Sequence, residues 1–116
     1  MATPPSNANR RRSERVMLEI AVTVLAETRE RTPMRKPART LVVNAHGGLL
    51  KLRMELLAGQ PLTLVDEKSG KQERAHVVRV EQSAADYFLV AFEFARPAPN
   101  FWPIVFPPGD WAVKTS

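Results

Sequence analysis

The sequence contains no cysteine, which excludes disulfide bonds and thiolate chemistry. Its only histidines are His46 and His76, too few to predict a zinc site built from the chain's own side chains. No apolar run approaches the ~20 residues that a membrane-spanning helix needs, so no membrane span is expected. The N-terminal segment "MATPPSNANRRRSER" lacks the apolar stretch of a secretion signal. We therefore expect a cytoplasmic protein that carries no metal and no cofactor.

The common catalytic motifs are also missing. The sequence has no nucleophile motif, no phosphate-binding P-loop and no glycine-rich dinucleotide fingerprint. Its acidic residues lie on the expected polar faces of strands or in turns, and no pair of carboxylates stands out for acid–base catalysis. These absences favour a binding domain over an enzyme.

Positive charge is concentrated at one end of the sequence. Residues 1–39 carry nine Lys and Arg side chains against four Asp and Glu, whereas residues 40–116 carry eight of each kind. The whole formal net charge of +5 therefore belongs to the N-terminal third. Such asymmetry indicates an anionic partner, for which nucleic acid, a phosphate ligand and a lipid headgroup are the candidates.

Alternating apolar residues predict β-strands packed against a core. In residues 19–27 and 87–94 every second residue is apolar, which is the period of a half-buried strand. No segment shows a convincing helical period. The residues on the two inward-facing sides are Ile20, Val22, Val24, Ala26, Phe88, Val90, Phe92 and Phe94.

Residues 16–95 are expected to form about six strands. The polar residues 28–39, with two prolines, are expected to be a connection, and the Gly47-Gly48 pair indicates a sharp turn or a bulge. The number and spacing of strands predict an all-β fold, a small antiparallel six-stranded β-barrel. The further apolar segments are residues 40–54, 61–67 and 72–82.

Segments of different composition flank the predicted barrel. Residues 1–15 have nothing to bury and are expected to form a flexible basic arm. Residues 96–116 are rich in proline and hold four aromatic side chains, which predicts an extended C-terminal strap whose aromatic rings bury against the barrel. A role in stacking on a ligand is the alternative for these rings. They are Phe101, Trp102, Phe106 and Trp111.

Two arginines directly before the first strand are spaced for a bidentate ligand. Arg11 and Arg15 lie four residues apart, a reach of about 13 Å in an extended chain. The guanidinium fork pairs two-for-two with phosphate oxygens or with O6 and N7 of guanine. Arg10 and Arg12 are possible additional contacts, or they keep the arm soluble. A solvated tail is the alternative for the whole cluster.

The segment "VVNAHGGLLKL" supplies the second set of candidate ligand contacts. Asn44 and His46 have the same parity, so they would project on the same side of a strand. Gly47 and Gly48 would let the backbone approach a ligand closely, or form a bulge at the rim of the barrel.

The order of these parts resembles a PilZ domain. The resemblance extends from about Arg11 to Phe94, through "RSERVMLEIAVTV", "TLVVNAHGGLLKL", "GQPLTLV", "AHVVRV" and "FLVAFEF". In that family an R-x-x-x-R motif precedes the first barrel strand, and Arg11 to Arg15 match it. The resemblance implies a cytoplasmic receptor or adaptor domain that binds the bacterial second messenger cyclic di-GMP. It implies that Arg11 and Arg15 contact phosphate and the Hoogsteen edge of guanine.

The family's second motif, Asp/Asn-x-Ser-x-x-Gly, is matched in part. Placing Gly48 on the motif's glycine puts Val43 and Ala45 on the two polar positions. Placing Asn44 on the first position puts His46 where serine belongs and the glycine one residue early.

Three functions follow from this partial match. The first is cyclic di-GMP binding, with the arm closing over the ligand and passing the signal to a downstream protein that the sequence does not identify. The second is a degenerate PilZ-like module that contacts proteins and binds no nucleotide. The third, nucleic-acid binding by a small basic barrel, is disfavoured because residues 40–116 carry no net charge.

Overall fold

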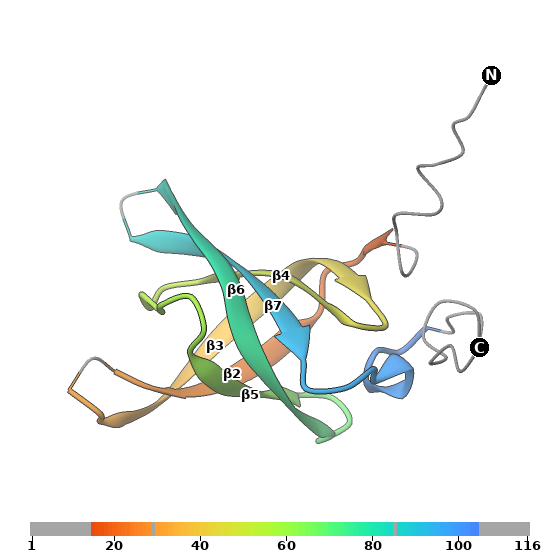
Figure 1. The fold of residues 1–116 in the computed structure, drawn as a ribbon. Helices are drawn as coiled ribbons and strands as arrows, with labels where there is room; N and C mark the ends of the chain where they lie inside the picture. Colours follow the sequence, from red (N-terminus) through yellow and green to blue (C-terminus); the bar gives the residue numbers. More distant parts are fainter. Residues whose placement is uncertain (1–14, 29, 85, 105–116) are drawn as a thin grey trace, which may run out of the picture.

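The computed structural model describes residues 15–28, 30–84 and 86–104 (Figure 1). These residues form seven β-strands and one short 3-10 turn, and no α-helix occurs among them. Within the same ranges, no helix has the length and apolarity that crossing a membrane would require. The elements are β1 (Val16–Met17), β2 (Ala21–Glu27), β3 (Pro33–Asn44), β4 (Gly47–Leu52), β5 (Pro61–Asp66), β6 (Gln72–Ala84), β7 (Tyr87–Phe94) and η1 (Pro99–Phe101).

Six of the strands close into a barrel. The strands β3, β2, β5, β6, β7 and β4 are hydrogen-bonded in that order, and the pairing of β3 with β4 completes the ring. Every neighbouring pair is antiparallel. The short β1 pairs with β3 outside the ring. The predicted all-β, six-stranded antiparallel barrel is therefore confirmed, with one additional strand.

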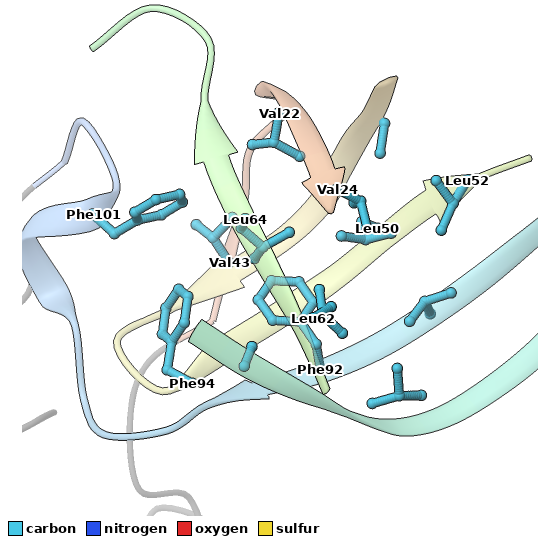
Figure 2. Close-up of a cluster of buried hydrophobic side chains, with 14 of the residues drawn as sticks. Val22, Val24, Val43, Leu50, Leu52, Leu62, Leu64, Phe92, Phe94 and Phe101 are labelled. Atoms are coloured by element: carbon cyan, nitrogen blue, oxygen red, sulfur yellow. The ribbon is translucent and has the colours of Figure 1, made fainter. Parts of the chain in front are cut away.

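The inward-facing side chains form one core (Figure 2). The predicted inward residues of β2 and β7 lie in it: Val22, Val24 and Val90 are fully buried, whereas Ile20, Ala26 and Phe88 pack against the core from its margin. The other barrel strands contribute Ala38, Thr40, Val43, Leu50, Leu52, Leu62, Leu64, Ala75 and Val77.

The prediction of a polar connection at 28–39 is wrong for most of its length, because β3 begins at Pro33. Residues 33–37 pair with β2 alone, so their other side is an open edge. A proline there leaves no ladder hydrogen bond unmade, which explains why Pro33 and Pro37 are tolerated in a strand. Much of the basic N-terminal third therefore belongs to the β2–β3 hairpin.

Bulges in β3 and β6 change which residues face outward. The register of β3 against β4 shifts between Thr40 and Val42, and that of β6 against β7 shifts between Val77 and Arg79. A bulge places two successive residues on the same side of the sheet. In β6 the exposed pair is Val78 and Arg79, between residues that point inward or toward the core.

The two ends of the barrel are covered by non-strand segments. Met54 and Leu56 lie between β4 and β5 and are buried. Phe101 and Trp102 follow β7 and are buried in the same core. The segment that contains η1 lies at the end of the barrel opposite the β4–β5 connection (Figure 1). The predicted burial of strap aromatics is confirmed for these two, although the segment includes the short turn η1 and is not extended throughout. Phe106 and Trp111 lie outside the described residues.

Candidate functional site

The pairing of β1 with β3 brings Arg15 to Asn44. In this ladder Val16 is opposite Val43 and Met17 is opposite Val42. Continuing the register by one residue places Arg15 opposite Asn44, and side chains directly opposite each other project on the same face of a sheet. Residues 29 positions apart in the sequence therefore meet on the outer surface of the barrel.

A buried threonine fixes the chain between β1 and β2. The hydroxyl of Thr40 donates to the Leu18 carbonyl (2.7 Å) and accepts from the Ile20 amide (2.9 Å). The Thr40 amide donates in turn to the Ile20 carbonyl (3.0 Å). Because β1 has only two paired residues, these hydrogen bonds help to hold it, and hence Arg15, against β3.

The segment predicted to carry the second motif forms the β3–β4 hairpin. Asn44 pairs with Gly47, so Ala45 and His46 are a two-residue turn. The Asn44 Oδ1 accepts a hydrogen bond from the His46 amide (2.7 Å), an arrangement typical of asparagine in turns. His46 therefore lies in a turn, and the expectation that it shares a strand with Asn44 is wrong. The two residues nevertheless line the same pocket.

The two glycines are required by close contact with neighbouring backbone. A Cβ atom on Gly47 would overlap the carbonyl oxygen of Phe92 and lie 2.9 Å from the Cα of Glu93. A Cβ atom on Gly48 would lie 2.5 Å from the Val42 carbonyl oxygen. The glycine pair thus allows β4 to lie tightly between β3 and β7 below the turn.

A pocket of about 320 Å³ opens on the outer surface beside this turn. Its walls are formed by Arg15, by the hairpin turn and by residues of β6 and β7. Its lining residues are Arg15, Val42, Asn44, His46, Gly47, Gly48, Leu49, Val78, Arg79, Ala91, Phe92 and Glu93.

The pocket contains every described residue that the sequence analysis selected for ligand contact. These are Arg15, Asn44, His46, Gly47 and Gly48. The remaining candidates, Arg10, Arg11 and Arg12, lie outside the described residues.

The structure distinguishes the two placements of the second motif. Val43 and Ala45 are both fully buried, so their side chains are unavailable to a ligand on the surface. Asn44 and His46 line the pocket. The placement that starts at Asn44 is therefore the one whose side chains lie at the site.

Two pocket residues, Val78 and Arg79, were missed by the sequence analysis. The β6 bulge directs both outward, and Val78 is 47% exposed, which is high for an apolar side chain in a strand. A sequence signal for this bulge exists. In "AHVVRV" the inward residues Ala75 and Val77 are followed by Val80, an interval of three where strict alternation requires two.

The charges around the pocket are mixed, with basic groups in excess. Arg15, directly before β1, and Arg79, in β6, are exposed cations. Glu93 is the acidic lining residue, and its Oε1 lies 3.6 Å from the Nε2 of His76. Among the described residues, no group of three or more His, Cys, Asp or Glu side chains is placed to hold a metal ion. The arrangement is suited to an anion that also has hydrogen-bonding edges.

A larger groove of about 880 Å³ lies elsewhere on the barrel, along β2, β3, β5 and β6. Its charged residues include Arg35 and Arg74, but none of the predicted ligand contacts line it. These two arginines therefore provide controls for the effect of positive charge away from the candidate site.

No protein-family model and no curated protein matches this chain in sequence comparisons.

Proposed function

We propose that this protein is a PilZ-like receptor that binds cyclic di-GMP in the pocket formed by Arg15, the Asn44–Gly48 turn and Arg79. One observation carries the proposal: β1 and the β3–β4 hairpin bring the arginine of the R-x-x-x-R segment together with the polar turn in one pocket. The partial sequence match and the spatial arrangement therefore support the same ligand.

The arginines suit the two kinds of acceptor on this ligand. A cyclic dinucleotide carries two phosphate charges, and guanine presents O6 and N7 on its Hoogsteen edge. A guanidinium fork pairs bidentately with either group. Arg15 lines the pocket from the residue before β1 and Arg79 lines it from β6, so one can bind phosphate while the other binds a base. Arg11 belongs to the same proposal through the R-x-x-x-R spacing.

Asn44 can contact the ligand as a hydrogen-bond donor. Its Oδ1 already accepts the His46 amide, and its Nδ2 makes no hydrogen bond to another described residue. The Nδ2 group is therefore placed to donate to a ligand acceptor such as guanine O6 or N7. Val78 adds an apolar surface at the same pocket, against which the face of a base can pack.

Isothermal titration with cyclic di-GMP tests the proposal. We expect cyclic di-GMP to bind at this pocket. Arg15→Ala and Arg79→Ala should each lower the affinity about tenfold or more, the loss typical of a charge-assisted hydrogen bond. Arg11→Ala is expected to weaken binding similarly. The matched controls Arg35→Ala and Arg74→Ala remove the same charge in the other groove and should change the affinity less than twofold.

Cyclic di-AMP separates base recognition from phosphate recognition. Adenine has an amino group where guanine has O6, so the bidentate arginine contact is lost. We expect cyclic di-AMP to bind more weakly than cyclic di-GMP.

Two outcomes would favour the other functions. The absence of binding heat with cyclic di-GMP at ~100 µM would contradict the proposal and favour an interaction module that binds no nucleotide. Binding to generic single strands with a steep salt dependence would instead support the nucleic-acid alternative.

A further inference from the structure

The last residue of β7 and the residues that follow it hydrogen-bond to three successive carbonyl groups of the site turn. The Trp102 Nε1 donates to the Asn44 carbonyl (2.8 Å) and the Ala98 amide donates to the Ala45 carbonyl (2.9 Å). The Phe94 amide donates to the His46 carbonyl (2.7 Å). The backbone of the turn is therefore held from below by the end of β7 and the start of the strap.

The same segment contacts the floor of the pocket through an aromatic cluster. The ring of Trp102 lies 6.3 Å from that of Phe92, which lines the pocket. Trp102 also packs on Phe94 (5.8 Å) and on Phe101 (4.8 Å), with ring geometries between tilted and T-shaped. Figure 2 shows Phe92, Phe94 and Phe101 in one group beside Val43. Trp102 of the strap thus contacts the site in two ways: its N–H donates to the Asn44 carbonyl, and its ring packs near that of Phe92.

We infer that Trp102 is a positioning residue for the ligand site, and that docking of the strap and occupancy of the pocket stabilise each other. Trp102 is 2% exposed, so it does not reach a ligand in the pocket. Its N–H instead holds the backbone of Asn44, whose side chain closes the turn on the His46 amide. Binding favours the arrangement in which the turn is held, and by linkage it favours the docked strap by the same factor.

This coupling links occupancy of the pocket to the docking of Trp102. The inference rests on the proposed function for its ligand, but the positioning of the turn is a property of the protein alone. A ligand that tightens the turn also tightens the contact of Trp102 at the other side of the hairpin.

The test compares Trp102→Phe with the unmodified protein. Phenylalanine keeps an aromatic ring in the cluster and removes the N–H donor. Amide hydrogen exchange, measured by NMR on the ligand-free protein, should become about tenfold faster at Ala45, His46 and Gly47, because the turn opens more often. The amides of Val22 and Val24, opposite Ala38 and Lys36 in the β2–β3 ladder and so at least six residues along β3 from Asn44, should be unchanged. Affinity for cyclic di-GMP should fall about fivefold, which corresponds to one neutral hydrogen bond.

A matched control removes a strap contact that does not reach the turn. The Lys71 Nζ donates to the Asn100 carbonyl (2.7 Å) at an exposed position. Lys71→Met should leave both the exchange of the turn and the affinity within twofold, when measured at about 150 mM salt to screen the lost charge. Reciprocally, saturating ligand should slow exchange of the Trp102 indole N–H in the unmodified protein.

The outcomes separate the inference from the proposed function. If the unmodified protein binds and Trp102→Phe binds equally well, the coupling is overturned while the proposed function stands. If exchange rises equally at all amides, the residue acts on global stability and the positioning role is overturned. If the unmodified protein does not bind cyclic di-GMP but exchange rises at the turn alone, the positioning role is supported and the proposed function fails.

Discussion

At the scale of single residues, the site depends on Gly47, which has no side chain, as much as on its charged residues. Gly47 lies where β4 is held against β7, and any Cβ there would overlap the Phe92 carbonyl oxygen. The backbone cannot move away without breaking the pairing of Gly47 with Glu93 and of Gly48 with Phe92. The glycine is therefore required by the barrel whether or not a ligand approaches it.

Gly47→Ala is expected to destabilise the fold by about 2–4 kcal/mol, because it forces an overlap between backbones. Urea denaturation followed by circular dichroism measures this loss. Gly70→Ala is the control: nothing lies within 4 Å of its added Cβ, but its φ of 78° disfavours alanine. We expect about 1 kcal/mol there, from conformation alone. Equal losses at the two glycines would show that the close contact at Gly47 is unimportant.

At the scale of elements, the position of Arg15 depends on a strand of two residues. Two pairs are too few to hold a strand by themselves, so β1 relies on its neighbours. Thr40 supplies the additional hydrogen bonds, to Leu18 and Ile20 in the connection that leads from β1 to β2. The arginine side of the pocket is therefore positioned by a buried polar group that does not line it.

Thr40→Val tests this dependence. The substitution keeps the volume of the side chain but leaves the Leu18 carbonyl and the Ile20 amide without their hydroxyl partner. We expect a loss of about 1–3 kcal/mol in unfolding free energy, measured by urea denaturation, together with weaker ligand binding. The matched control is Thr23→Val, whose hydroxyl donates to Glu67 at an exposed position (2.8 Å). It should change stability by less than about 0.5 kcal/mol. A smaller loss at Thr40 than at Thr23 would contradict this account.

At the scale of the whole molecule, the barrel and the first strap residues share one core. Phe101 and Trp102 are as buried as the strand residues and belong to the same hydrophobic cluster. A segment that is buried in the core cannot leave without exposing large apolar surfaces. The strap is therefore expected to unfold together with the barrel, while small local openings of the turn remain possible.

This expectation is tested in a Trp111→Phe variant, in which Trp102 is the only tryptophan. Fluorescence of Trp102 and circular dichroism of the strands should give coincident urea transitions, as required of a two-state domain. Leu50→Ala, at a fully buried position, should lower the unfolding free energy by about 2–5 kcal/mol and shift both transitions together. A fluorescence transition at lower urea than the strand transition would show that the strap is a separate unit.

Local sequence patterns predicted the barrel because a strand needs only a period of two to define its inward face. The alternation around Val22 and Val90 identified core residues correctly. The same patterns failed at residues 33–37, where prolines indicate a connection but an unpaired strand edge accepts them. Strict alternation also missed Arg79, because the inward residues Val77 and Val80 are three positions apart at the bulge.

The amino-acid sequence is sufficient to establish the all-β architecture, the location of the core strands and the candidates Arg15, Asn44 and His46. It does not show that these side chains share one pocket, that Val43 and Ala45 are buried, or that Trp102 holds the turn, and these features are known from the fold. Hydrophobic alternation is a local property of the chain. Register, bulges and the hydrogen bond between residues 44 and 102 depend on which distant segments pair.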